Sequence, residues 1–297
     1  MSTGGFVLID KAPGWTSHDV VAKVRKQVGG KVGHAGTLDP MATGLLVIAL
    51  GRATRLLRFV QGRPKEYLAS AVLGVATDSL DADGAVLSRE PLPVSEEEVR
   101  AAMRRFEGRI LQVPPMVSAR KIGGKRLYSL AREGKEVERE PRPVDIHHLE
   151  LVDFAPGAYP EMTFVVRCGT GTYVRTLADD IARSLGGRAH LTSLRRTRNG
   201  TLSVESATSV EEFVAAAEDG TGGEFIIPPA TVLGDLAEAT VDSNLVQAVR
   251  NGAPVPVTIL ETELPDETYV RMLDSSGDLL GIYRVAGRTA KPEVVLA

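Results

Sequence analysis

Strand-length apolar runs and amphipathic helical segments are interspersed from residue 5 to about residue 225, without the regular spacing of repeated βαβ units. Strands are expected at 5–11, 45–50, 65–74, 144–154 and 162–168, and helices at 17–30, 53–62, 95–108, 172–187 and 209–220. This irregular order favours an α+β fold with a mixed, mostly antiparallel sheet flanked by helices.

Helix starts are marked by short polar residues that can accept hydrogen bonds from the first turn. Ser95 with Glu98 three positions later has the pattern of a capping box, and Ser17 is the expected N-cap of the first helix.

The pattern of residues changes after about residue 225. From there on, short β-like runs are separated by proline and glycine turns, and one helix is expected near 241–252. This predicts two domains, a large one over 1–228 and a small β-rich one over 229–297. The segment from Ile226 to the end is acidic, with five Lys or Arg and ten Asp or Glu residues.

Composition places the chain among ordinary globular proteins, with 297 residues, 43% hydrophobic and 25% charged. No apolar run approaches the roughly 20 residues that a transmembrane helix needs. The start of the sequence lacks the pattern of a secretory signal, and the single cysteine, Cys168, excludes an intramolecular disulfide. A cytoplasmic location is expected.

The net charge of −3 hides local groups of basic residues, each of which suits either phosphate binding or a solvated helix face. The groups are Arg188, Arg195, Arg196 and Arg198; Arg52, Arg55, Arg58, Arg63 and Lys65; and Arg120, Lys121, Lys125 and Arg126.

The segment GHAGTLDPMATGLL (33–46) combines small residues with His34 and Asp39 between an expected helix and an expected strand. Such a loop lets the backbone approach a ligand while it presents a carboxylate. From residue chemistry alone, Asp39 is also explained as a turn-forming residue before Pro40, which is the commoner use of an Asp-Pro pair, and His34 as a structural loop residue. A phosphate cradle is excluded, because no Lys-Ser/Thr pair follows the glycines.

A second segment, CGTGTYVRTLADDIA (168–182), ends a strand in a glycine-rich turn and starts a helix with Tyr173 and Arg175. An arginine at a helix start is unfavourable to the helix dipole, so a carboxylate partner is expected for Arg175. Otherwise, Tyr173 is a packing residue and Arg175 a surface residue. By themselves, Tyr67 in KEYLASAVLG is an ordinary strand aromatic and HLTSLRRTRNG (190–200) a surface turn.

Taken together and in this order, these segments resemble the motifs of the TruB family of tRNA pseudouridine synthases. The segment 33–46 is similar to the family's catalytic loop, KEY to its tyrosine motif, and GTYVRTLADDI to its third motif. LTSLRRTRNG resembles its Leu-Arg-Arg segment, LIDKAPGWTSHDVV its opening motif, and residues 114–143 its RNA-gripping thumb. The resemblance spans about residues 5–225.

The chain departs from the family pattern at three places. Ala12 follows Lys11 where the family has a proline, and Gly169–Gly171 stands where a serine and often a lysine are expected. The tail is shorter and more acidic than the family's usual PUA domain, and is similar to the reduced C-terminal domain of actinobacterial members.

The resemblance implies a pseudouridine synthase fold with a small PUA-like C-terminal domain. It implies isomerisation of uridine 55 in the TΨC loop of elongator tRNA, with no cofactor, no metal, no membrane, no guide RNA and no protein partner, by a monomer. The implied catalytic residues are Asp39, Tyr67 and Arg175. The implied substrate-binding residues are Lys11, His34, Arg120, Lys121, Tyr173, Leu194, Arg195 and Arg196.

In this scheme Asp39 acts as a nucleophile toward C1′ or as a base at the sugar, and the sequence leaves both open. The Arg175 guanidinium keeps Asp39 ionised, while His34 fills the space that the flipped base leaves.

Other functions remain open at this stage. A tRNA-folding chaperone would bind the T-arm without catalysis, although chaperoning and catalysis can coexist. A guide-dependent pseudouridine synthase shares the aspartate loop, but the thumb and the reduced tail favour the stand-alone form. A nucleotide-dependent α/β enzyme is suggested only by the glycine-rich turns.

Overall fold

The computed structural model describes residues 4–116, 121–122, 125–126, 137–260 and 263–296. Contacts between Cα atoms divide the chain into two compact units. Unit 1 holds Met1–Asp39, Leu45–Gln61 and Thr201–Ala297, and unit 2 holds Pro40–Gly44 and Gly62–Gly200. The division predicted from the sequence, 1–228 and 229–297, stays a prediction.

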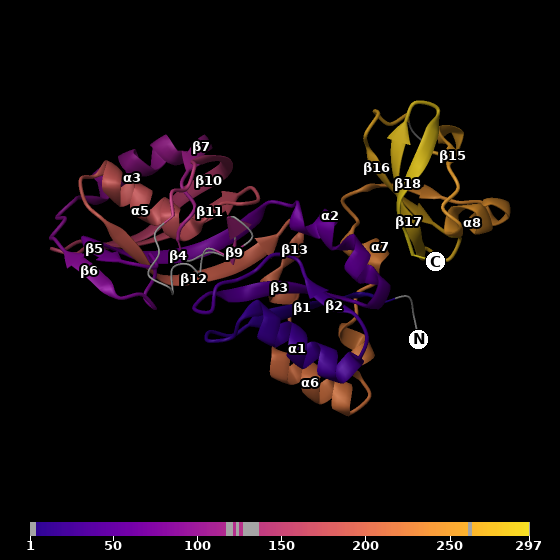
Figure 1. Ribbon diagram of the computed structural model, residues 1–297, viewed down its shortest axis with the longest axis horizontal. Coiled ribbons are helices and arrows are strands. Elements are labelled where there is room, and N and C mark those ends of the chain that lie inside the picture. Colours follow the sequence, from indigo (N-terminus) through magenta and orange to yellow (C-terminus); the bar gives the residue numbers. More distant parts are fainter. Residues whose placement is uncertain (1–3, 117–120, 123–124, 127–136, 261–262, 297) are drawn as a thin grey trace. The chain divides into compact units, whose positions relative to one another are not determined.

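Unit 1 contains strands β1 and β3 next to each other, with β2 antiparallel to β3. Helices α1 and α6 lie side by side beneath these strands in the view of Figure 1. The bounds are β1 (Phe6–Lys11), α1 (Ser17–Val28), β2 (Val32–His34), β3 (Thr43–Leu50), the 3-10 helix η1 (Gly51–Leu56), α2 (Leu57–Gln61) and α6 (Val210–Glu218).

The last part of unit 1 is a five-stranded sheet in the order β14-β16-β17-β18-β15, with helix α8 packed against it. Its elements are β14 (Ala237–Thr240), α8 (Ser243–Arg250), β15 (Val255–Pro256), β16 (Tyr269–Leu273), β17 (Leu279–Ala286) and β18 (Thr289–Val295). The β-rich tail with one helix near 241–252 is therefore confirmed.

Unit 2 is built on antiparallel strands in the order β12-β4-β11-β10-β7. The start of β3 pairs in parallel with β12, at Thr43 and Gly44. Helices α3 and α5 lie together against this sheet (Figure 1). The bounds are β4 (Lys65–Leu73), α3 (Glu96–Met103), β7 (Gly108–Gln112), β10 (Arg142–Ala155), β11 (Glu161–Cys168), α5 (Val174–Ser184) and β12 (Ala189–Asn199).

Shorter elements complete the described chain. They are β5 (Val75–Thr77), β6 (Val86–Arg89), η2 (Arg104–Phe106), β8 (Lys121–Ile122), β9 (Lys125–Arg126), β13 (Leu202–Ser203), η3 (Val204–Ser206), η4 (Gly222–Phe225), α7 (Pro229–Val232) and η5 (Val257–Ile259). The predicted α+β class with a mixed, mostly antiparallel sheet is confirmed.

The helix starts follow local side-chain chemistry. Ser95 and Glu98 form the expected capping box of α3. In α1 the N-cap is Thr16, which is extended and accepts a hydrogen bond from the backbone of Asp19, while the Asp19 carboxylate accepts from Thr16 in return. The expectation that Ser17 is the cap is therefore wrong, and Ser17 is instead the first residue inside the helix and buried.

The segment HLTSLRRTRNG is not a surface turn but most of β12, which lies between β4 and the start of β3. Leu191, Leu194 and Arg196 are all buried. The many polar residues of this segment favoured a turn, because the sequence alone does not show that the Arg196 side chain is buried. Residues 53–62, expected as one helix, are divided between η1 and α2.

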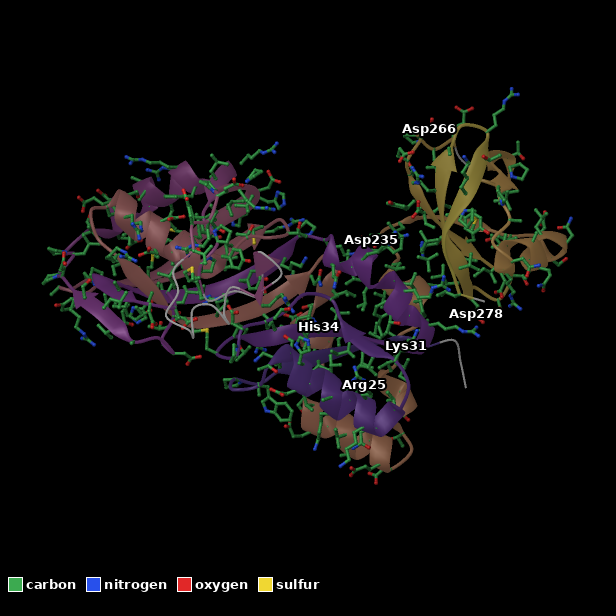
Figure 2. The ribbon with its side chains drawn as sticks, viewed as in Figure 1. Arg25, Lys31, His34, Asp235, Asp266 and Asp278 are labelled. Carbon is green, nitrogen blue, oxygen red and sulfur yellow. The ribbon has the colours of Figure 1, made fainter. Side chains whose placement is uncertain are left out.

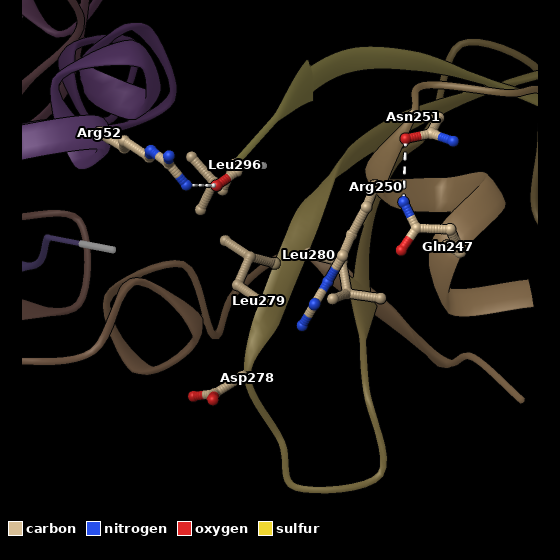
Figure 3. A pocket seen from close by; sticks show the side chains of 8 residues that line it. All are labelled: Arg52, Gln247, Arg250, Asn251, Asp278, Leu279, Leu280 and Leu296. Atoms are coloured by element: carbon tan, nitrogen blue, oxygen red, sulfur yellow. Dashed lines mark hydrogen bonds between the residues drawn. The ribbon is translucent and has the colours of Figure 1, made fainter. Parts of the chain in front are cut away.

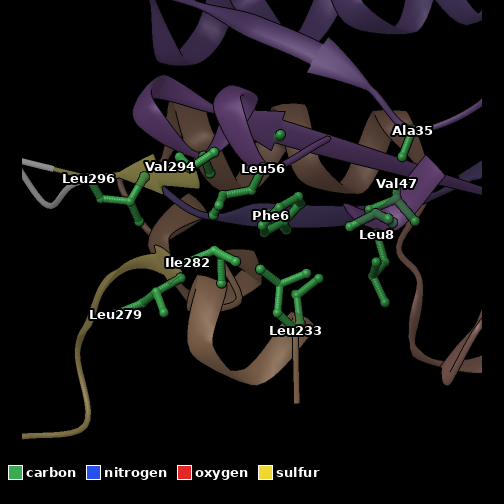
Figure 4. Packing of buried hydrophobic residues seen from close by; sticks show 14 of the residues in the cluster. Phe6, Leu8, Ala35, Val47, Leu56, Leu233, Leu279, Ile282, Val294 and Leu296 are labelled. Carbon is green, nitrogen blue, oxygen red and sulfur yellow. The ribbon is translucent and has the colours of Figure 1, made fainter. Parts of the chain in front are cut away.

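One hydrophobic cluster in unit 1 joins the first strands to the last third of the chain (Figure 4). Phe6, Leu56, Leu233 and Ile282 are completely buried in it, and Val294 and Leu296 nearly so. Residues on both sides of position 228 therefore share one core.

Three arginines of η1 and α2 contact the C-terminal segment. Arg52 donates to the Leu296 carbonyl at 3.0 Å, Arg55 to that of Val295, and Arg58 to the Glu293 carboxylate at 2.7 Å. From the sequence, these arginines suited either phosphate binding or a solvated face. In the structure, all three make contacts within the protein.

Candidate active site

Asp39 lies in the loop between β2 and β3, an antiparallel pair in which His34 is opposite Ile48. The loop begins with a hydrogen bond from the Ala35 amide to the Val47 carbonyl at 2.9 Å. Leu38 is buried and Asp39 is half-buried. The hairpin therefore holds a partly accessible carboxylate on a loop that two strands and a buried leucine fix in place.

The last glycine of GHAGTLDPMATG is required by a close backbone approach. Gly44 has φ +94°, and a Cβ at this position would lie 2.3 Å from the Arg196 carbonyl oxygen. Since Gly44 pairs with Arg196 in the parallel contact between β3 and β12, any larger residue would disturb that pairing.

Tyr67 on β4 lies directly opposite Arg196 on β12 and Val166 on β11. Leu194 lies opposite Ala69 in the same antiparallel pair. Directly opposed residues share a face of the sheet, so the structure brings Tyr67, Leu194 and Arg196 to one face.

Arg195 is opposite Leu68 and therefore belongs to the other face. Arg196 is 1% exposed, whereas Arg195 is half-buried. The two adjacent arginines therefore occupy different environments, and only Arg196 shares the face of Tyr67.

Arg175 is buried in the first turn of α5, as 3% exposure of the residue shows. Its Nη1 donates to Asp81 Oδ2 at 2.9 Å and to the Ser79 carbonyl at 2.8 Å. Asp81 is 4% exposed, and its Oδ1 accepts from the Ser79 hydroxyl and from the Asp83 amide. A carboxylate partner was expected for Arg175, and Asp81 is one that the sequence reasoning missed.

Tyr173 is the residue before α5, and its backbone is held by the side chain of Gln112. The Tyr173 amide donates to Gln112 Oε1 at 2.7 Å, and Gln112 Nε2 donates to the Tyr173 carbonyl at 3.1 Å. Gln112 is 2% exposed and ends β7. This pairing fixes where α5 begins, and no feature of the sequence signalled it.

Lys65 starts β4 two residues before Tyr67 and donates from Nζ to the Arg63 carbonyl at 2.7 Å. Burial, together with the charge of Arg196, lowers the pKa of Lys65 to about 8. Burial also raises the pKa of the neighbouring Cys168 thiol to about 11. This end of the Tyr67 face is thus basic and poorly hydrated.

His34 projects from the end of β2 (Figure 2). Its ring packs edge-on against His18, with ring centroids 5.6 Å apart, and its carbonyl accepts from Gln61 Nε2 at 3.2 Å. Lys11 is completely buried, and its Nζ donates to the carbonyls of Ala12 and Trp15. Lys11 therefore stabilises the turn that leads into α1.

Of the expected thumb, Arg120 lies outside the described residues. Lys121 lies in β8, whose backbone pairs it with Arg126 in β9. The expected site residues are divided between the two units. Unit 1 contains Lys11, His34 and Asp39, and unit 2 contains Tyr67, Tyr173, Arg175, Leu194, Arg195 and Arg196. The pairing of Asp39 with Arg175 stays a prediction.

Asp180 gives a pH-dependent prediction. Burial, reinforced by the adjacent Asp179 and partly opposed by Arg183, raises its pKa to about 6. The folded state therefore binds more protons than the unfolded state between about pH 4 and pH 6, so the free energy of unfolding falls as pH rises through this window. Asp180→Asn is expected to raise the free energy of unfolding at pH 7.5 by about 1 kcal/mol, a value reduced for partial exposure.

Urea unfolding at pH 4.5 and pH 7.5 measures this effect. Asp219→Asn, at an exposed carboxylate after α6, is the matched control and should leave the difference between the two pH values unchanged. Equal pH dependence in the native protein and Asp180→Asn would contradict the prediction.

A pocket of about 380 Å³ lies in unit 1 (Figure 3). It is lined by Arg52, Gln247, Arg250, Asn251, Asp278, Leu279, Leu280 and Leu296. None of the residues expected to act in catalysis or substrate binding lines it, so we do not assign it to the candidate site.

Within the described ranges, no group of three or more His, Cys, Asp or Glu side chains is arranged to hold a metal ion. In the same part of the chain, every helix lacks the length and apolar character that crossing a membrane requires.

Comparison with known families gives two adjoining matches. Residues 23–174 match "TruB family pseudouridylate synthase (N terminal domain)", and residues 175–229 match "tRNA pseudouridylate synthase B C-terminal domain". A protein of Symbiobacterium thermophilum named tRNA pseudouridine synthase B is 48% identical over 84% of this chain and 82% of its own length. One of the same name from Moorella thermoacetica is 42% identical over 98% of this chain and 99% of its own length.

Solved structures agree with these matches. A structure described as an H/ACA RNP bound to a substrate RNA containing 2′-deoxyuridine has a TM-score of 0.77 and 25% identity, covering 99% of this chain and 86% of that one. A structure described as a Cbf5-Nop10-Gar1 complex has a TM-score of 0.77 and 27% identity, covering 99% of this chain and 85% of that one.

The fold, and the motifs in their order along the chain, thus define a pseudouridylate synthase, which is an isomerase. The chain belongs to the TruB family, and the resemblance seen in the sequence is confirmed.

Proposed function

We propose that the chain converts uridine 55 in the TΨC loop of elongator tRNA to pseudouridine. The observation that carries this proposal is the aspartate loop of the β2–β3 hairpin in a chain that matches a tRNA pseudouridine synthase B over nearly its full length. The thumb-like segment and the basic residues around Tyr67 support an RNA substrate.

The reaction rearranges atoms without adding or removing any. The bond between N1 of uracil and C1′ of the ribose breaks, the base turns, and C5 bonds to C1′ while the C5 proton moves to N1 through the enzyme or solvent. Asp39 supports the cleavage, either as a nucleophile at C1′ or as a base that removes a sugar proton. Arg175 keeps the carboxylate ionised, since a neighbouring guanidinium favours the charged form.

The target base has to leave the stacked T-loop before Asp39 can reach it. His34 fills the vacated space, Tyr67 stacks on the flipped base and acts in proton removal from C5, and Tyr173 and Leu194 line the pocket.

Basic residues hold the RNA backbone, which gives position rather than sequence readout. We assign this role to Lys11, Arg120, Lys121, Arg195 and Arg196. Because Lys11 and Arg196 are buried, we propose that these two act indirectly, by supporting the turn and the strand that carry the RNA-binding surface.

A guide-dependent function is the second candidate, favoured by the likeness to a Cbf5 complex and an H/ACA RNP. The relatives named tRNA pseudouridine synthase B are more similar in sequence, at 48% and 42% identity, and one of them covers 98% of this chain, so they favour a stand-alone enzyme. We therefore propose that a single chain acts in the cytoplasm without a guide RNA, protein partner or cofactor.

Incubating the purified chain with a bare T-arm stem-loop tests this proposal. We expect conversion at the uridine that corresponds to position 55, mapped by carbodiimide modification and primer extension. A matched stem-loop with cytidine at this position is the control and should remain unmodified. Conversion only after addition of a guide RNA, or at another uridine, would contradict the proposal.

A further inference from the structure

The first turn of α1 contacts the loop that carries Asp39. In the sequence this turn is Thr16, Ser17, His18 and Asp19, and both the turn and the loop up to Asp39 belong to unit 1. Thr16 and Asp19 close the capping box with each other. Because Thr16 satisfies the helix end, the hydroxyl of Ser17 is available for another contact.

The Ser17 hydroxyl bonds to the residue just before Asp39. Its Oγ accepts a hydrogen bond from the Leu38 amide at 2.9 Å and donates to the Leu38 carbonyl at 3.2 Å. Ser17 is 1% exposed and Leu38 3% exposed, so water is not available to replace these bonds. A buried backbone donor and acceptor that lose their partner cost free energy, and the loop would move to satisfy them.

A second contact joins the same turn to the same loop. The exposed His18 packs its ring against His34 at an interplanar angle of 78°, the edge-to-face arrangement that aromatic rings favour. Ser17 and His18 therefore fix the loop at two points, one on each side of Gly36 and Thr37.

We propose that Ser17 is a positioning residue for catalysis, which sets the place of the Asp39 carboxylate through the backbone of Leu38, with His18 as a weaker support through His34. The inference rests on the proposed role of Asp39. Ser17 does not contact the substrate in this proposal. A shift of about 1 Å at a reacting group lowers a rate by roughly 100-fold, so a small movement of the loop has a measurable effect.

The test is Ser17→Ala in the full chain, with single-turnover conversion of a T-arm stem-loop measured beside its Kd. We expect the rate to fall about 10- to 100-fold, with the Kd changed by less than about threefold, because the loop is displaced but the RNA-binding surface is kept. Amide hydrogen exchange supplies the direct readout, and exchange at Leu38 should be at least about tenfold faster, since its amide loses its acceptor.

Thr16→Ala is the matched control. It removes the N-cap of α1, which costs about 1 kcal/mol of stability, and does not touch the Leu38 hydrogen bonds. We expect a measurable drop in thermal midpoint, but an unchanged single-turnover rate. If Ser17→Ala fails to fold, His18→Ala, at an exposed position, decides by a rate that falls roughly threefold or more at constant Kd.

Faster exchange at Leu38 with an unchanged rate would overturn the positioning role and leave the proposed function intact. A rate loss of the same size in Thr16→Ala would also overturn it, because the effect would then follow helix stability. Asp39→Asn measured in parallel separates the two proposals, since full activity of that variant means that the proposed function itself fails.

Discussion

Turnover is expected to fall by roughly 10⁴-fold or more when Asp39 is replaced by asparagine. Asparagine keeps the size of the side chain but is a poor nucleophile and has no useful basicity, so either role proposed for the carboxylate is lost. Release of tritium from tRNA labelled at C5 of uridine measures the reaction, because the C5 proton leaves only after the new bond to C1′ has formed.

Binding separates loss of chemistry from loss of structure. The Kd of Asp39→Asn for tRNA, measured by filter binding at one fixed salt concentration, should stay within about threefold, since phosphate contacts supply most of the affinity. Asp153→Asn, at an exposed carboxylate on β10, is the matched control and should keep full turnover. Substantial tritium release by Asp39→Asn would contradict the assignment of Asp39.

Local sequence signals were reliable where one short segment determines the structure. The structure contains the capping box predicted at Ser95 and the strands predicted at 65–74 and 162–168. At α1 the signal was ambiguous because Thr16 and Ser17 are both good caps, and only the spacing to Asp19 selects Thr16. That choice gives the Ser17 hydroxyl its contact with Leu38.

Long-range pairing was not predictable from local signals. The strand β12 resembles a polar turn in sequence, and its place between β4 and β3 depends on residues more than 100 positions away. Gly44 could be recognised as a special glycine from the motif, but the reason for it, the carbonyl of Arg196, appears only in the folded chain.

The partner of Arg175 shows the same limit. The helix-dipole argument predicted that a carboxylate should be near, which is correct, but it could not select one. Asp81 lies 94 positions away in a turn-rich loop, DSLDADG, in which three aspartates are equivalent by sequence. The fold selects Asp81 because that carboxylate is buried beside the start of α5, while Asp83 is exposed.

Asp81→Asn is expected to reduce single-turnover conversion about 100-fold, because Arg175 would lose the charge that holds its guanidinium in place. Removing one partner of a buried ion pair also costs roughly 3–5 kcal/mol of stability, since the buried guanidinium would lose the carboxylate that pairs with it. Urea unfolding measures the stability and a quenched-flow assay on a T-arm stem-loop the rate. Asp83→Asn, in the same loop but exposed, should change neither.

A double-mutant cycle with Arg175→Met tests whether the two residues act as a pair. If Asp81 matters because it holds Arg175, the loss in the double variant should be close to the larger single loss, and the free energy of unfolding should partly recover, since no unpaired charge remains. If the increases in activation free energy of the two single variants add in full in the double variant, Asp81 acts independently of Arg175.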